Sequence, residues 1–312
     1  DGTQLRAVER GGVREIEGTR TTKIEASWRV PTVVLDGTAT VGLARALWPK
    51  IETALDIAVE APHQELIRVT GRQFGKNWQN PTGSSEEEDQ RRLNNIAKLR
   101  RVIEHQAALA WPETVGFIGH KRTVELLQLG GLPENLEMAN FGALRGLNSM
   151  SAVLTLIICG RPRPGDAELE HLARVLDGGE GAAETVAAVG WSIVQAELLQ
   201  AVARVRGIRR TAENPVRVYL LNQEPVPGVT ATVDWDEIQP APLELLAARG
   251  IAEIDTRDKG AWGVVAAVLP DLYATAAAAR KGFHRSRGQT PIYNSPIGVC
   301  PRERRAYARV KV

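Results

Sequence analysis

Several arginines gather where a predicted helix ends, in the stretch Glu197-Leu-Leu-Gln200-Ala-Val-Ala-Arg204-Val-Arg206-Gly207-Ile-Arg209-Arg210. Gln200 and Arg204 are four residues apart, so a helix places them on one face. Gly207 lets the chain turn, so that Arg209 and Arg210 project in another direction. A guanidinium group stabilises the charge that develops on a transferred phosphoryl group, by roughly 10³–10⁵ in rate. The alternative is a helix whose solvated basic end is favoured by the macrodipole.

A second candidate lies about fifty residues earlier, in Asn140-Phe-Gly-Ala-Leu-Arg145-Gly146-Leu-Asn148. The pattern predicts a loop that follows a strand. Gly146 beside Arg145 would let the backbone approach a phosphate, and Asn148 could bind a ribose or a bridging water. A left-handed turn between a strand and a helix explains Gly146 equally well.

Two cations and an aromatic residue, Arg72, Lys76 and Trp78, lie within the first eight residues after a predicted strand at 65–70. Such a loop can line a nucleic-acid track, because cations contact phosphates and an indole stacks on bases. A solvated, mobile loop over residues 71–89 is the alternative, since this segment is rich in Gly, Asn, Ser and Glu.

The chain ends in a basic segment. From residue 280 onward there are nine Lys and Arg against one acid, Glu303, although the whole chain has a net charge of +2. Arg280, His284 and Arg287 are spaced i, i+4, i+7, which places them on one helix face. A recognition helix presents such a face to DNA, and a soluble basic surface is the alternative. The excess of positive charge suggests a polyanionic partner.

Predicted strands alternate with predicted helices, which favours an open, mostly parallel α/β sheet with ligands at the carboxyl ends of the strands. The strands are expected at 31–35, 65–70, 114–118, 136–141, 153–158 and 216–221, and the helices at 41–48, 90–108, 121–129, 168–176 and 191–205. Beyond residue 227 the pattern changes to helices at 242–249, 261–269 and 271–285, followed by a strand at 305–312. That order predicts a small helix-turn-helix or winged-helix domain.

Composition excludes several classes of protein. The chain has 312 residues, 43% of them hydrophobic and 24% charged, as in globular proteins. Cys159 and Cys300 form no C-x-x-C motif, so a disulfide scaffold and a zinc ribbon are not expected, and we expect the cytoplasm. The histidines show no metal spacing, and neither a signal peptide nor a bilayer-spanning run is visible. Because the chain begins with Asp1 and not Met, we expect the C-terminal portion of a longer protein.

Four segments, in order, resemble the second RecA-like domain of superfamily-two helicases. Asp36-Gly37-Thr38-Ala39 resembles the DATA strand end, and the segment ending in His120-Lys121 takes the place of the fourth motif. The stretch ending in Arg145-Gly146-Leu147-Asn148 resembles the fifth motif, with Asn where Asp is common. Gln200-Ala-Val-Ala203-Arg204 resembles the sixth, Q-x-x-G-R-x-x-R, with Ala in place of Gly and the second arginine at 206 or 209.

The resemblance implies a connecting hairpin or linker at 1–30, a RecA-like domain at 31–225 and a basic DNA-binding domain at 240–312. It implies catalytic roles for Gln200, Arg204, Arg206 and Arg209, a nucleotide-coupling loop at Arg145, Gly146 and Asn148, and nucleic-acid contacts from Arg72, Lys76, Trp78, Lys121, Arg280, His284 and Arg287. The chain has neither a G-x-x-x-x-G-K-[ST] motif nor an Asp-Glu pair that ends a strand. ATP and Mg²⁺ would therefore bind through an upstream RecA-like domain, and none would bind to this chain alone.

The partners would be DNA and that upstream domain, with no membrane and no metal site of the chain's own. The parent would be a DNA helicase or translocase, for example a replication protein of a phage, plasmid or integrated element. The alternative is a non-catalytic DNA-binding regulatory or replication-initiation protein whose α/β domain mediates assembly. A Rossmann-like enzyme ranks last, because no G-x-G-x-x-G follows a strand.

Overall fold

The structure is a computed structural model. It describes residues 4–10, 12–20, 25, 27, 30–31, 33–34, 38, 41–48, 50–57, 59–146, 148–251, 253–255, 257–286 and 309–311. The chain divides into two compact units. Unit 1 comprises Asp1–Val59, Pro162–Gln200 and Glu224–Val226, and unit 2 comprises the remaining residues.

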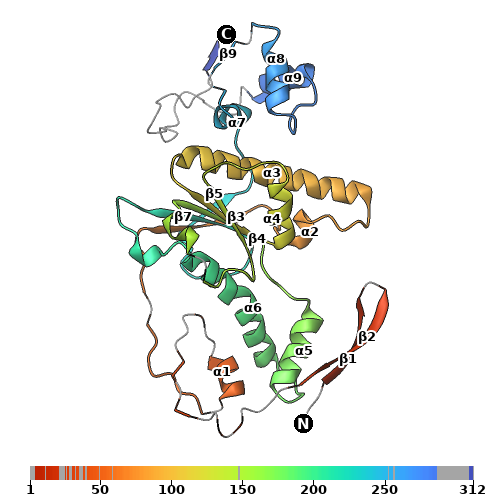
Figure 1. Ribbon diagram of the computed structural model, residues 1–312, viewed down its shortest axis with the longest axis vertical. Coiled ribbons are helices and arrows are strands. Elements are labelled where there is room, and N and C mark those ends of the chain that lie inside the picture. Colours follow the sequence, from red (N-terminus) through yellow and green to blue (C-terminus); the bar gives the residue numbers. More distant parts are fainter. Residues whose placement is uncertain are drawn as a thin grey trace. The chain divides into compact units, whose positions relative to one another are not determined.

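Unit 2 is built on a six-stranded sheet in which every pairing is parallel (Figure 1). The strand order is β5 (Leu136–Asn140), β4 (Val115–Gly119), β6 (Thr155–Cys159), β7 (Val216–Leu221), β3 (Gln64–Thr70) and β8 (Ala231–Asp234). All five residues of β4 and of β6 are buried. Strands that are covered on both faces read as unbroken apolar runs, which is why the sequence identifies these two so clearly.

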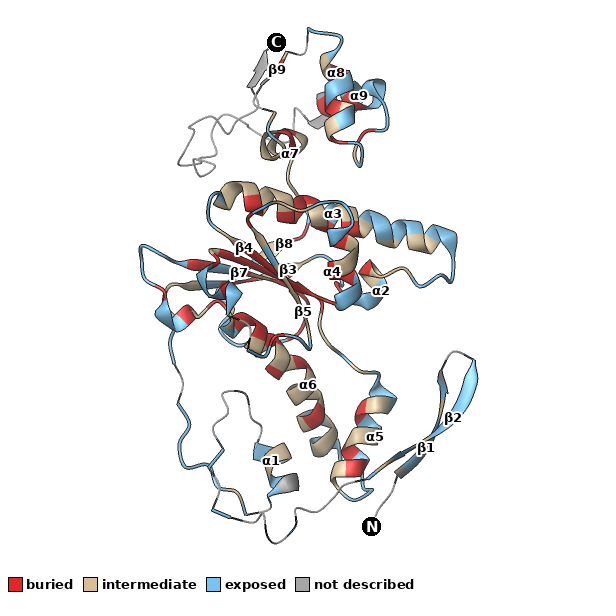
Figure 2. Ribbon diagram, viewed as in Figure 1, coloured by how far each residue is buried: buried red, intermediate tan, exposed pale blue. Residues whose placement is uncertain are grey.

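Two helices cover one face of this sheet, α3 (Glu86–Ala110) and α4 (Lys121–Gln128), after the short α2 (Lys76–Gln79). Leu99 and Ile103 of α3 belong to the same buried cluster as Phe117 of β4 and Ile157 of β6. The burial colouring in Figure 2 follows this contact, since α3 is buried toward the sheet and exposed along its N-terminal part. Short 3₁₀ turns occupy η2 (Ser149–Ala152) and η3 (Gly207–Arg209).

Unit 1 holds a hairpin, β1 (Gln4–Arg10) with β2 (Val13–Thr19), together with α1 (Val41–Leu47) and α5 (Asp166–Leu176). It also holds most of α6 (Ala183–Ala203). Arg6 binds Glu17 and Glu168, each at 2.5 Å, so an ion-pair cluster joins the hairpin to α5. Leu169, Ala173 and Val189 form a small core between α5 and α6.

The C-terminal part of unit 2 contains α7 (Pro242–Ala248), β9 (Glu253–Asp255), α8 (Ala261–Val268), α9 (Ala276–Ser286) and β10 (Arg309–Lys311). Its core includes Leu246, Trp262 and Phe283. β9 and β10 pair in parallel. The three expected helices are present, whereas a winged-helix arrangement is not confirmed, because residues 287–308 lie outside the described residues.

Three expectations for the elements were wrong or incomplete. No strand includes Pro31, Val33 or Val34, and Val33 is 84% exposed. An apolar run becomes a strand only where neighbouring strands supply hydrogen bonds. The segment 71–89 is not a plain loop, because it contains α2 and the start of α3. The short strands β8 and β9 were missed, since three or four residues carry little periodicity.

Candidate functional site

The two candidate segments with the most specific chemistry meet in unit 2. Nη2 of Arg206 donates a hydrogen bond to Oδ1 of Asn148 at 3.1 Å. Arg206 has φ of 52°, and among the described residues it is the one non-glycine with a positive φ. A left-handed conformation costs an L-residue about 1–2 kcal/mol, and such outliers concentrate at functional sites. The turn directs Arg206 away from the course of the helix and toward the loop that carries Asn148.

A buried arginine, Arg210, is hydrogen-bonded to the end of the same loop. Arg210 is 6% exposed, and its guanidinium donates to the carbonyl oxygens of Ser151 and Val153, each at 2.8 Å, and of Val205 at 2.9 Å. It also donates to Oδ1 of Asn214 at 3.1 Å. Desolvation lowers the pKa of the Arg210 guanidinium. The loop before β6 and the segment after α6 are therefore joined through one side chain that sequence reasoning did not single out.

The loop itself is anchored at Leu144, which is 1% exposed, while Arg145 and Asn148 are exposed beside it. Gly146 has φ of 77°, so a left-handed turn requires glycine here whether or not a phosphate approaches. A Cβ at Gly146 would meet no atom within 4 Å. The backbone at this position is therefore open to an approaching group.

Two other predicted residues lie together in unit 1. Nε2 of Gln200 donates to Oγ1 of Thr38 at 3.3 Å. The segment that resembles the sixth motif therefore contacts the segment that resembles the DATA strand end. Asp36, Gly37 and Ala39 lie outside the described residues. In unit 2, Arg204 is half-buried and Arg209 is exposed.

The predicted nucleic-acid contacts lie at the carboxyl edge of the sheet. Lys121 is exposed at the start of α4, directly after β4, and Lys76 is exposed at the start of α2. Arg72 follows β3, and its Nη2 lies 3.7 Å from Oδ1 of Asp236. Oγ1 of Thr123 in α4 donates to Oε1 of Gln79 in α2 at 2.9 Å, so the two helices that begin with Lys121 and Lys76 are in contact.

Trp78 is partly buried and packs against the core cluster under the sheet. Its ring centroid is 5.1 Å from that of Phe74 and 5.7 Å from that of Trp235, both in edge-to-face geometry. Phe74 and Trp235 are almost fully buried. The packing of these three rings accounts for Trp78, which explains why a loop that looked solvated from its composition contains ordered structure.

His120 lies in the segment that resembles the fourth motif, and its environment in the structure is unusual. It is 6% exposed, its ring lies 5.6 Å from Phe141, and its Nε2 is without a hydrogen-bond partner. A Cβ on Gly160 would stand 2.8 Å from this nitrogen, so only glycine fits after β6. Burial, together with the charge of Lys76, lowers the pKa of His120 to about 4. The imidazole is neutral near pH 7.

His120 and Gly160 also occupy a special position in the topology. β4 and β6 are neighbours, but the chain leaves β4 toward β5 on one side and leaves β6 toward β7 on the other. Open α/β sheets bind ligands at the carboxyl ends of strands at such a switch point. The signal that could have identified His120 is its place directly after the buried strand 114–118.

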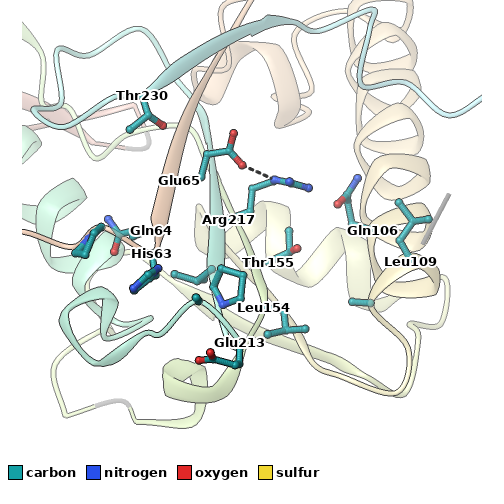
Figure 3. Close-up of a pocket in the computed structure, with 15 residues that line it drawn as sticks. His63, Gln64, Glu65, Gln106, Leu109, Leu154, Thr155, Glu213, Arg217 and Thr230 are labelled. Carbon is teal, nitrogen blue, oxygen red and sulfur yellow. Dashed lines mark hydrogen bonds and ion pairs between the residues drawn. The ribbon is translucent and has the colours of Figure 1, made fainter. Parts of the chain in front are cut away.

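A pocket of about 850 Å³ lies at the opposite, amino-terminal edge of the sheet (Figure 3). Glu65 and Arg217 face each other across β3 and β7, with Oε2 of Glu65 2.8 Å from Nε of Arg217. Gln106 and Leu109 of α3 form its far wall. None of the predicted site residues lines this pocket.

The C-terminal candidates are described only in part. Arg280 is exposed on α9. The side chain of His284, and all of Arg287, lie outside the described residues. In the part of the chain that the structure describes, no group of three His, Cys, Asp or Glu could hold a metal ion.

One helical segment, Ala183–Arg209, is long and apolar enough to cross a membrane by composition. A core helix of a soluble protein has the same properties, and Leu198 and Ala201 within the segment are fully buried. In all, 33% of the most apolar window of this segment is buried, and a single helix of this kind is weak evidence for a membrane span. Comparisons with protein-family models, with curated proteins and with solved structures found no match.

Proposed function

We propose that this chain is the second RecA-like domain of an ATP-dependent DNA helicase or translocase of the cytoplasm. It would supply an arginine finger and part of the DNA track, while ATP and Mg²⁺ would bind through a partner RecA-like domain with a phosphate-binding motif. The observation that carries the proposal is the hydrogen bond from Arg206 to Asn148. It joins the two segments that resemble the fifth and sixth helicase motifs, which lie 58 residues apart in the chain.

The geometry favours Arg206 over its neighbours as the finger. Arg210 is fully engaged with backbone carbonyls, and Arg209 is exposed beyond the turn. Arg206 is half-buried, held in a left-handed turn and bonded to a single exposed amide. A guanidinium bonded through one nitrogen keeps donors for the equatorial oxygens of a transferred phosphoryl group. A movement of Arg206 would then be transmitted through this hydrogen bond to the loop that carries Asn148.

The track would run along the carboxyl edge of the sheet. Lys121 and Lys76 are exposed there, and cations that contact phosphates position a strand without reading its sequence. Arg280 of α9, with the basic residues that follow it, would provide a further site for DNA. Replication of a mobile element would suit such a motor, and this biological role rests on the sequence resemblance alone.

The test compares turnover with and without a phosphate-binding domain. The isolated 312-residue chain is expected to show no DNA-stimulated ATP hydrolysis, and a polypeptide that contains both RecA-like domains is expected to show it. In that polypeptide, Arg206→Ala should lower turnover by about two orders of magnitude or more and change nucleotide affinity much less. Near-normal turnover in Arg204→Ala, Arg206→Ala and Arg209→Ala alike would exclude the finger. Turnover by the chain alone would exclude the whole proposal.

The non-catalytic alternative makes a different prediction for the same experiment. A DNA-binding regulator would bind DNA through the basic end of the chain but would show no nucleotide dependence of that affinity. A motor domain changes its affinity for DNA when the partner domain binds nucleotide, because the two ligands are linked thermodynamically. Measuring the affinity for DNA with and without a non-hydrolysable ATP analogue therefore distinguishes the motor from the non-catalytic regulator.

A further inference from the structure

The helices α7, α8 and α9 form a module with its own core. We call residues 242–286 the C-terminal helical module. Leu245, Leu246, Trp262, Val265 and Phe283 are buried within it, in a cluster distinct from the cluster under the sheet. Residues 236–241 connect it to the end of β8 and Trp235. Among the described residues, the two cores are thus separately closed.

Charged side chains meet where the module lies against α3. Nη1 of Arg101 is 2.6 Å from Oδ2 of Asp271, and Nη2 of Arg249 is 2.7 Å from Oε2 of Glu104. Nη1 of Arg249 also lies 3.5 Å from Oδ1 of Asp271. Arg101 and Glu104 belong to α3, whereas Arg249 and Asp271 belong to the module. We refer to these four residues as the ionic latch.

The latch is largely desolvated and electrically balanced. The exposed fractions of its side chains range from 10% for Arg101 to 25% for Asp271. Two further groups lie close by. Glu244 of α7 faces His105 of α3, and burial lowers the pKa of His105. Burial also lowers the pKa of the Arg100 guanidinium, which lies near the charges of Glu104, Arg249 and Asp271. Arg100 itself is held to the α/β part, because it donates to the carbonyl oxygen of Gly131 at 2.6 Å.

A contact of this kind differs from a shared apolar core. Removing paired charges from water costs nearly as much as their attraction returns, so the net stabilisation is small. When the latch opens, the charges regain their hydration and both apolar cores stay closed. The docked and released arrangements therefore differ little in free energy, and agents that change charge–charge attraction can shift the balance.

We propose that the C-terminal helical module is docked on α3 by this ionic latch and is released as a folded body when the latch is weakened. The release requires the connection to bend after Ile238, which packs against the cluster under the sheet. The inference does not depend on the proposed function, since it concerns the contacts between two parts of unit 2. It predicts a conformational change that is governed by charge and that leaves secondary structure unchanged.

The test measures the distance between the two parts in the full chain. Spin labels are placed on cysteines at Leu93 of α3 and Val264 of α8, which are 40% and 50% exposed, with Cys300 replaced by Ser. Pulsed dipolar spectroscopy is expected to give one narrow distance distribution at 0.05 M salt and a broad, longer one at 1 M salt. The far-ultraviolet circular dichroism should remain the same. A narrow distribution at both salt concentrations would overturn the proposal.

Charge reversal separates the latch from general effects of salt. Glu104→Arg should broaden the distribution already at 0.05 M salt, because it sets a second cation beside Arg249. The double variant Glu104→Arg with Arg249→Glu restores opposite charges and should be narrower than either single variant. Glu125→Arg is the matched control, since it makes the same change of charge in an exposed pair with Arg122 on α4, and it should behave as wild type.

The outcomes are distinct even if one variant folds poorly. A double variant as broad as both single variants, or a control as broad as Glu104→Arg, would overturn the proposal. If Glu104→Arg lost its circular dichroism signal, the salt series of the wild type and the control would still decide between release and a rigid contact.

Discussion

Arg206 and Asn148 are 58 residues apart in the chain, yet the guanidinium of the first donates to the side-chain oxygen of the second at 3.1 Å. The bond spans the end of a helix and an exposed loop, and it depends on a backbone conformation that non-glycine residues rarely adopt. The geometry of one main-chain turn thus decides where a charged side chain points. That dependence can be measured separately from any catalytic role.

The left-handed turn at Arg206 predicts an unusual order of stabilities. Arg206→Gly removes the hydrogen bond but also the strain, whereas Arg206→Ala removes the bond and keeps the strain. We expect the alanine variant to be less stable than the glycine variant by about 1 kcal/mol. The free energies of unfolding are obtained from urea titrations. In an ordinary helical conformation glycine would be the less stable of the two, so the reverse order would show that the turn is absent.

Arg210 should matter more to stability than any arginine around it. Arg210→Ala leaves the carbonyl oxygens of Val205, Ser151 and Val153 without their donor, in a site that is 6% exposed. We expect a loss of about 2–4 kcal/mol in the free energy of unfolding. Arg209→Ala, at an exposed position, is the control and should cost less than about 0.5 kcal/mol. Equal effects in urea unfolding would contradict the clamp.

His120 predicts a dependence of stability on pH. Its pKa is about 4 in the folded chain against an ordinary value of 6.5, so the unfolded chain binds more protons between these values. The stability that the neutral imidazole contributes is complete above about pH 6.5 and is lost as the pH falls toward 4. The loss is at most about 3 kcal/mol. In urea titrations between pH 7.5 and 4.5, His120→Gln should show a shallower decline than wild type, and parallel declines would refute this assignment.

The basic end predicts that DNA binding depends strongly on salt. If four or five of its cations contact phosphates, log K should fall with log salt with a slope of roughly −4. Arg280→Ala should flatten the slope by about one unit. Lys281→Ala is compared directly, because it removes the same charge one residue further along α9 and off the expected face. A slope near zero in fluorescence anisotropy titrations would show that the basic end does not bind DNA.

The parallel sheet was predictable because burial on both faces leaves a simple signal. Residues 115–119 are Val, Gly, Phe, Ile and Gly, residues 155–159 are apolar except for Thr155, and both segments are fully buried strands. The run at 31–35 is equally apolar, but composition does not record that it lacks a strand beside it. The packing of Trp78 could not be predicted for a related reason, since its partner Trp235 lies far away in the sequence.

Only those site residues that belong to short sequence motifs could be predicted from the sequence. Arg206 and Asn148 were identified from short motifs, and the structure brings them together. Arg210 and His120 were not identified, because their roles come from burial and from partners on other elements. Arg209 and Arg210 are adjacent and identical in sequence, yet the first is exposed and the second donates to three carbonyl groups.

The loop between β5 and β6 has a consequence for any ligand that approaches it. Leu144 and Met150 are buried on either side of Gly146, and Arg210 holds the carbonyls of Ser151 and Val153. Both ends of the loop are therefore fixed by the fold before anything binds. An incoming phosphate would not have to order the backbone, which otherwise costs about 1–2 kcal/mol for each residue that is fixed. Affinity at such a preorganised surface is limited by the number of contacts and by desolvation, and association should follow a single bimolecular phase.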